Sequence, residues 1–334
     1  MSTSQSEEDA SADPRIAAQA SENAPIARLA LRVAAGLSLL ALVVWYADPG
    51  ALWVELRRAD PWLFASAVLV AIAANLLSAA RWAIIARGLG LYAPYRRLVL
   101  MYARGITTNI VLPGATLSGD LLRSVQLSKI GNSFAASALS VFLDRFSGLW
   151  MLCGLSLVAA LVCIVWSLGF DGASAVPLDK LVLYSIVLAS VVALPLIPFS
   201  FARMKNSRHV LLAKFSSSWA RLERTILQAR PALLASVWRA FGVQFLSTCT
   251  FWISGLAVGV PLPFPAMLAA AAPIFVMAAL PLGVSGFGAR EFAAVIVLGA
   301  AGVPSEQAVA TSLLYGLASV VQGILAAPLF FTKP

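Results

Sequence analysis

Long apolar runs restrict the fold of this chain more than any other feature of its sequence. Several of them reach about 20 residues, the length that crosses about 30 Å of hydrocarbon as an α-helix. The composition agrees, because 60% of the 334 residues are hydrophobic, only 12% are charged and the mean hydropathy is +0.87. The short alternating strands of a β-barrel are not visible. The sequence therefore predicts an all-α, polytopic membrane helical bundle.

The positions of the basic residues predict the orientation of this bundle. Arginines follow the second apolar run, which places its end and the N-terminus in the cytoplasm by the positive-inside rule. The C-terminus then lies in the cytoplasm too. The run 133–168 contains two charged residues, and both one tilted helix and two shorter helices are consistent with it. The predicted full spans are 29–46, 62–85, 133–168, 181–200, 232–258 and 305–331.

Two polar segments lie outside the predicted spans. Residues 1–24 are small and acidic, which predicts a disordered cytoplasmic tail, and residues 25–334 form one transmembrane domain. Residues 203–230 carry seven basic residues against one acid, which is typical of an amphipathic connector on the membrane surface. The net charge of +9 does not indicate nucleic acid, because the basic residues cluster beside apolar segments, where they attract anionic lipids.

Two segments of the chain are broken by helix-breaking residues and charges inside apolar surroundings. In each one, Leu-Pro is followed by glycine and serine and then by an arginine beside an acid, at Arg123 in 98–128 and at Arg290 in 266–299. Each half of such a segment is too short to span, so each segment is predicted to form a re-entrant hairpin. Charges at this depth usually mark a functional cavity.

The order span, broken hairpin, span occurs twice, over about 62–168 and 232–331. The predicted orientation brings the first hairpin in from the cytoplasm and the second from the opposite side. The two halves would then form an inverted repeat, an architecture of carriers with a site near the membrane midplane.

A helix that begins inside the membrane presents free N–H groups and a positive dipole end, and an arginine nearby adds a fork of donors suited to phosphate. Ser118 and Ser285 are predicted to lie at such helix starts, where serine can cap the exposed donors. Two such ends facing each other would form one anion site for a lipid headgroup. The predicted substrate-binding residues are Arg104, Ser118, Gly119, Arg123, Ser285, Gly286, Gly288 and Arg290. The predicted residues for charge balance or proton coupling are Asp120, Asp144, Arg145 and Glu291, and Arg145 with Arg104 would also line the path.

A purely structural interpretation of these charges is open as well. An acid in the first turn of a helix stabilises the dipole without any ligand, and Asp120 and Arg123 are three residues apart and can pair. Asp144 and Arg145 point in different directions on their helix, so one of them is expected to pair with Arg104, Asp120 or Arg123. No catalytic residue, metal site or cofactor is predicted, since the chain has one histidine and its three cysteines lack metal-ligand spacing.

From about residue 30 to 331, the chain resembles the lysylphosphatidylglycerol synthase transmembrane family, the flippase-like proteins related to the membrane half of the multiple peptide resistance factor. In this sequence Ser118 stands where many members have a second glycine, and Ala289 where a valine is common. The resemblance is carried by Ser118-Gly119-Asp120-Leu121-Leu122-Arg123, by Phe142-Leu143-Asp144-Arg145 with Gly148-Leu149, and by Leu280-Pro281 through Gly286-Phe287-Gly288-Ala289-Arg290-Glu291.

The resemblance implies a protein of a bacterial inner membrane that moves phospholipids or lipid-linked headgroups between leaflets. Membrane lipids and a separately encoded lipid-modifying enzyme are candidate partners. The soluble aminoacylating domain of two-part members is not expected here, since the sequence ends at Pro334 soon after the last span. Two alternatives stay open. One is an integral membrane transferase that uses Asp120, Asp144 or Glu291 as base or metal ligand, and the other is a non-transporting scaffold for envelope synthesis.

Overall fold

The computed structural model describes residues 34–111, 117–169, 178–193, 210–280 and 286–332. All regular secondary structure within these residues is helical. The helices are Ala34–Tyr46, α2 (Pro49–Arg58), α3 (Pro61–Gly88), α4 (Tyr95–Val111), α5 (Leu117–Ser128), α6 (Phe134–Gly169), α7 (Leu178–Ala193), α9 (Val210–Ala257), α10 (Phe264–Ala279), α11 (Ala289–Gly299), α12 (Ser305–Ala326) and the 3₁₀ helix η2 (Ala327–Phe330).

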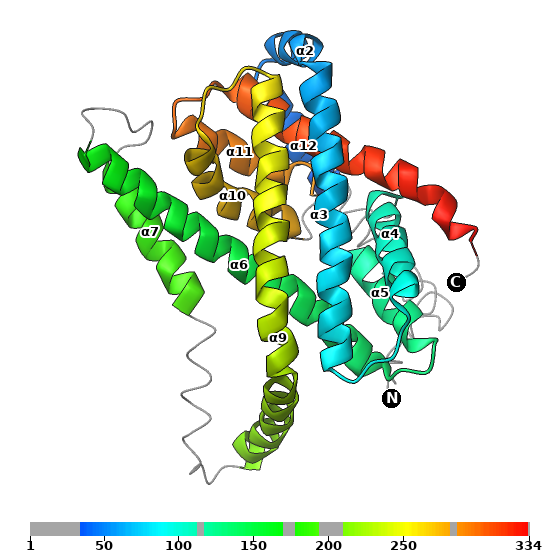
Figure 1. Cartoon of the computed structure of the whole chain (residues 1–334). Coiled ribbons are helices and arrows are strands. Elements are labelled where there is room, and N and C mark those ends of the chain that lie inside the picture. The colour runs from blue at the N-terminus through cyan, green and yellow to red at the C-terminus, as the bar shows by residue number, and fades with distance from the viewer. Residues whose placement is uncertain (1–33, 112–116, 170–177, 194–209, 281–285, 333–334) are drawn as a thin grey trace, which may run out of the picture.

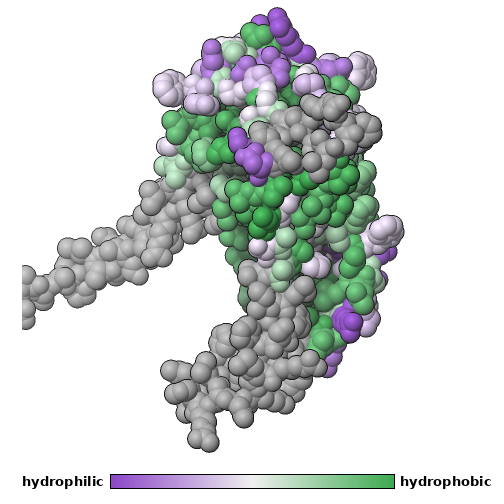
Figure 2. All heavy atoms as spheres, turned by 90° about the vertical axis from the view of Figure 1, so that its left-hand side faces the viewer, coloured by the Kyte–Doolittle hydropathy of each residue, from purple (hydrophilic) through white to green (hydrophobic). Residues whose placement is uncertain are grey.

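Four helices are long and apolar enough to cross a membrane, which confirms the polytopic helical fold class. They are α3, α6, the part of α9 from Thr225 onward, and α12 continued by η2. A fifth span is possible by length and composition if Ala34–Tyr46 and α2 count as one helix bent by 87°. In Figure 2, hydrophobic residues form a broad band beneath a hydrophilic cap. Of the span predicted at 181–200, the structure describes residues up to Ala193, within α7.

Two helices of the bundle are more continuous than the sequence indicated. The segment predicted as one or two helices at 133–168 is the single helix α6. The surface connector predicted at 203–230 and the span after it share one helix of 48 residues, α9, which passes through Pro231. The proline therefore does not separate the two, and residues 203–209 lie outside the described part of the chain.

Helices α3 and α9 lie side by side and antiparallel at the centre of the bundle (Figure 1). Their ends meet where the N–H of Asp60 donates to the carbonyl of Ala257 at 2.9 Å. Near the other end a Cβ on Gly88 would lie 2.2 Å from the Cβ of Ala232. Small residues at the contact let the two backbones approach closely, which is a common means of helix association in membranes.

The other contacts within and between the groups α3–α6 and α9–α12 occur in matching pairs, while the contacts of α6 with α7, of α12 with α2 and of α4 with η2 fall outside this pattern. Helix α3 contacts α4, α6 and α12, and α9 contacts α10, α12 and α6. Helices α4 and α5 contact each other, as do α10 and α11. Helix α4 also contacts α12, while α10 contacts α6, and α5 packs on α6 as α11 packs on α12. These contacts form the same set when α3 is exchanged with α9, α4 with α10, α5 with α11 and α6 with α12.

Each of the two groups of four helices has its own apolar core. Trp82, Leu98, Leu127 and Val141 belong to a core formed by α3, α4, α5 and α6. The second core includes residues of α9, α10, α11 and α12, with Phe251, Ile274, Leu298 and Val309 among them. The two motif arginines thus lie on helices that are packed into different cores.

Candidate functional site

Helix α5 begins close to where the sequence predicted a helix start and lies tightly against α4. A Cβ on Gly119 would lie 2.2 Å from the carbonyl oxygen of Gly105, so only glycine fits at this crossing. The side-chain oxygen of Asn109 on α4 accepts from the N–H of Gly119 at 2.7 Å and lies 3.4 Å from the Oγ of Ser118. The neighbouring helix therefore supplies a cap that the sequence assigned to Ser118.

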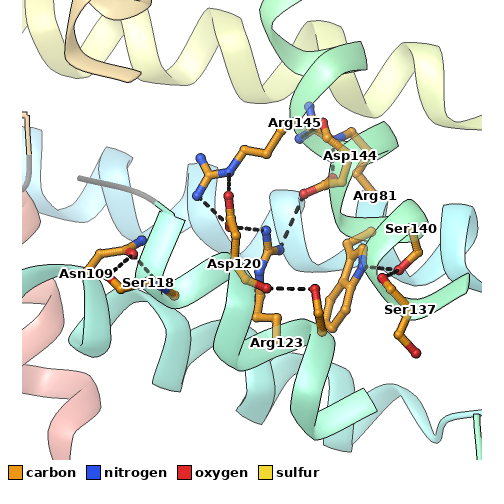
Figure 3. A network of polar contacts seen from close by, with 12 residues as sticks. Arg81, Asn109, Ser118, Asp120, Arg123, Ser137, Ser140, Asp144 and Arg145 are labelled. Atoms are coloured by element: carbon orange, nitrogen blue, oxygen red, sulfur yellow. Dashed lines mark hydrogen bonds and ion pairs between the residues drawn. The ribbon is translucent and has the colours of Figure 1, made fainter. Parts of the chain in front are cut away.

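Five charged side chains from three helices form one continuous network (Figure 3). Asp144 Oδ1 accepts from Arg81 Nε at 2.8 Å, and its Oδ2 lies 3.4 Å from Arg123 Nη1. Arg123 Nη2 donates to Asp120 Oδ1 at 2.7 Å, and Arg145 Nε donates to Asp120 Oδ2 at 2.8 Å. Arginine and aspartate alternate along the network, so each carboxylate bridges two guanidinium groups. The predicted pairing of Asp120 with Arg123 and the predicted partner for Asp144 or Arg145 are confirmed.

Aromatic rings flank the central arginine of this network. The Cζ of Arg123 lies 5.0 Å from the ring centroid of Trp82 and 4.7 Å from that of Tyr102. Trp82 is fixed in turn, because its Nε1 donates to the Oγ of Ser140 at 3.1 Å. Rings at these distances attract a guanidinium group, more strongly where water is excluded. Arg123, itself buried, is thus held in place by two acids and two rings.

A cavity of about 200 Å³ opens beside the network. A single water molecule needs about 10–15 Å³ of such space, so the cavity has room for a group larger than one water molecule. Arg145 is the most exposed member of the network, with 39% of its side chain accessible, compared with 13% for Asp120. The cavity is lined by Asn75, Tyr102, Gly105, Ile106, Asn109, Ile110, Gly119, Asp120, Arg123, Arg145 and Ser319.

The second motif forms a compact cluster at the start of α11. Glu291 Oε2 accepts from the N–H of Gly288 at 2.6 Å, and its Oε1 accepts from Arg290 Nη2 at 2.7 Å. Arg290 Nε also donates to the Oγ of Ser312 on α12 at 2.9 Å. The arginine lies between the rings of Phe287 and Tyr315, at 4.8 and 5.4 Å. Both charged side chains are buried, and the glutamate caps its own helix without a ligand.

The structure places Arg123 and Arg290 in different clusters, whereas the sequence predicted one chamber for both. Arg290 is not among the described residues that line the cavity. A Cβ on Gly316 would lie 2.2 Å from Arg290 Nη2, so α12 closes directly over this arginine. Ser285 lies outside the described residues. Gly286 and Gly288 have positive φ angles of 79° and 92°, and both approach backbone carbonyls of other helices.

One face of α12 connects the two clusters. Ser312 and Gly316 contact Arg290, and Ser319 lines the cavity. Further along this face the carbonyl of Gly323 accepts from Thr107 Oγ1 on α4 at 2.9 Å. Ser312 and Ser319 are seven residues apart, which is about 10 Å along a helix. The Arg290 cluster and the cavity beside the other network therefore border successive turns of the same helix.

Arg104 has a different position from the one expected. It is buried, and its Nε and Nη2 donate to the backbone carbonyls of Leu329 and Thr332 at 3.0 and 2.6 Å. It is not among the described lining residues of the cavity. The guanidinium group instead binds the chain after α12, where the last carbonyls of a helix lack partners within the helix.

The sequence interpretation missed two charged or polar members of the site. Arg81 was used only to orient the second span, although it lies within an apolar run and is buried in the structure. The general rule that a charge inside a span needs a partner could have pointed to it. Asn109 gave no comparable signal, because its role depends on how α4 and α5 pack.

Comparison with protein families adds an independent line of evidence. Residues 30–327 match the family described as "Lysylphosphatidylglycerol synthase TM region". The chain belongs to this family. Its members are integral membrane proteins related to lipid modification or transport, and the family is associated with membrane lipids. A search of curated proteins found no match to the chain.

Proposed function

We propose that this family member moves a phospholipid or a lipid-linked headgroup between the leaflets of a bacterial inner membrane. The observation that carries the proposal is a cavity inside an apolar helical bundle that has the charged side chains of Arg123, Asp120 and Arg145 in its lining. The headgroup phosphate binds there to arginine, whose fork of donors matches phosphate oxygens. The acyl or prenyl chains stay in the surrounding bilayer.

The architecture that performs this movement is an inverted repeat, in which α3 to α6 correspond to α9 to α12. Three observations support it: the matched set of helix contacts, the antiparallel run of α3 and α9, and one apolar core for each half. In this proposal α4 with α5 and α10 with α11 are the two re-entrant hairpins. Carriers of this kind alternate by moving one repeat against the other around a site near the midplane.

The two motif arginines then act in turn rather than together. Arg123 lines a cavity that is open in the described conformation, while Arg290 is covered by Gly316 and paired with Glu291. Because the halves exchange their conformations in an inverted repeat, the opposite state opens the cluster of Arg290 and closes that of Arg123. Arg290, Gly286 and Gly288 are substrate-binding residues in that state.

The test is reconstitution into vesicles with labelled phospholipids, comparing leaflet exchange for wild type and Arg123→Gln. A hydrogen bond to a charged group contributes about 1.5–3 kcal/mol, so exchange is expected to slow by about 10- to 100-fold.

A second variant, Arg123→Gln with Asp120→Asn, keeps the net charge of the network and tests the guanidinium fork by itself. The matched control is Arg239→Gln on α9; among the described residues this arginine donates to the carbonyl of Ala235 on its own helix and takes no part in either cluster. Equal exchange by all four proteins would refute the proposed role of Arg123.

A further inference from the structure

The two charged clusters differ in their balance of charge. The network beside the cavity contains three arginines and two aspartates, which leaves one positive charge. The cluster at the start of α11 contains one arginine and one glutamate, which leaves none. Each aspartate accepts from two guanidinium groups, the arrangement of an ionised carboxylate. The described residues show no further ion pair on either cluster.

Two of the three arginines of the network are buried, and the third is partly exposed at the cavity. Arg81 and Arg123 are buried, and their guanidinium groups contact Asp144 or lie between rings. Arg145 is the exception, since it ends the network, lines the cavity and is partly exposed. An uncompensated charge in an apolar environment is unfavourable, and an anion in the cavity would neutralise it.

The other residues that line the cavity are suited to the uncharged part of such a ligand. Asn75, Asn109 and Ser319 line the cavity with polar but uncharged side chains, so they add no further charge beside the ligand. Asp120 is the one carboxylate among the described lining residues, and Arg123 and Arg145 already bind both of its oxygens. An ammonium group in the ligand would therefore find no free carboxylate here and would oppose the surplus positive charge.

We propose that the cavity selects a lipid headgroup with one net negative charge, a phosphodiester without a compensating amine, and that Arg145 sets this preference. The inference rests on the proposed function for the choice of a lipid, and it goes further by naming the charge of the headgroup. It is a statement about binding, so it can be tested separately from movement between leaflets.

Binding is measured on the full chain in nanodiscs that contain phosphatidylglycerol and phosphatidylethanolamine in known amounts, by native mass spectrometry of the retained lipids. Wild type is expected to retain the anionic lipid with at least about tenfold preference, which corresponds to about 1.4 kcal/mol. Arg145→Gln makes the network neutral and is expected to abolish the preference, while Arg145→Lys keeps it. Arg239→Gln serves as the matched control for loss of an arginine elsewhere.

The outcomes separate the inference from the proposed function. An unchanged preference in Arg145→Gln, or no preference in wild type, overturns the inference even if leaflet exchange is intact. A preference for the anionic lipid that is lost in Arg145→Gln and kept in Arg145→Lys supports the inference, even if the protein moves no lipid between leaflets. Soluble glycerophosphoglycerol is the second ligand in the test. If it competes as strongly as the lipid, the assignment to a lipid is overturned. Thermal unfolding of each variant checks that a folded protein was compared.

Discussion

At the scale of single residues, the partners of each arginine decide what it can do. Arg123 and Arg290 have similar surroundings, with an acid on the same helix and two aromatic rings, yet only Arg123 lines the cavity. The sequence predicted the pairing of Asp120 with Arg123 because a spacing of three is fixed by helix geometry. It missed Arg81, although a charge inside a span needs a partner, and it could not name that partner, because the partner depends on how the helices pack.

Asp144 is the residue on which the stability of the network is expected to depend most. It is buried and contacts both Arg81 and Arg123, so Asp144→Leu leaves two buried guanidinium groups with too few acceptors. Removing one partner of a buried ion pair costs about 3–5 kcal/mol, and a comparable loss in the free energy of unfolding is expected. Reversible denaturation in detergent measures it.

A second variant separates loss of the pair from loss of packing. Arg81→Met with Asp144→Leu removes both charges and is expected to recover most of the stability, because well-packed apolar replacements of a buried pair are often neutral. Asp179→Asn, at the start of α7, is the control for an acid outside the network. A single Asp144→Leu variant as stable as wild type would show that the network does not stabilise the fold.

At the scale of elements, the sequence located the helices better than it located their breaks. The motif helices were predicted near Ser118 and Ser285, and the structure begins them at Leu117 and Ala289. Pro231 does not interrupt α9, although proline removes one backbone hydrogen bond. Local propensity predicts neither the exact starts of the motif helices nor the continuity of α9, because packing against neighbouring helices decides whether a break is tolerated.

The contact between α4 and α5 is expected to depend on the absence of a side chain at residue 119. A Cβ there would lie 2.2 Å from a backbone oxygen on α4, so Gly119→Ala must move one helix away from the other. The displacement also shifts Asp120 and is expected to lower the free energy of unfolding by about 1–3 kcal/mol, as overpacking does. Denaturation in detergent and leaflet exchange are both measured.

The matched control is Gly154→Ala in α6, where an added Cβ meets no atom within 4 Å. This change is expected to be neutral or to stabilise the helix by about 0.5–1 kcal/mol, because alanine favours helix more than glycine does. If both variants behave alike, the close approach of α4 and α5 is not a constraint on the fold.

At the scale of the whole molecule, the contacts between helices relate the two halves more clearly than the repeated motifs in the sequence do. The two motifs are similar only in outline, and their proline-to-arginine spacings differ by one residue. The helix contacts nevertheless match pair by pair across the two halves, with α4 on α12 and α10 on α6. Such contacts depend on which helices meet in space, and a single sequence carries little information about that. One face of α12 borders the cavity at Ser319 and contacts the Arg290 cluster at Ser312.

That face provides a test of alternation in which two positions on one helix are compared. In a background with Cys153, Cys163 and Cys249 replaced, Ser319→Cys lines the cavity and is expected to react quickly with a water-soluble maleimide. Ser312→Cys, about 10 Å away along α12, is buried against Arg290 and is expected to react slowly. If the halves alternate, conditions that sustain leaflet exchange raise the reactivity at 312 and lower it at 319, because opening one cluster closes the other. A protein that exchanges lipid at the wild-type rate while residue 312 stays unreactive would mean that the bundle moves lipid without opening its second half.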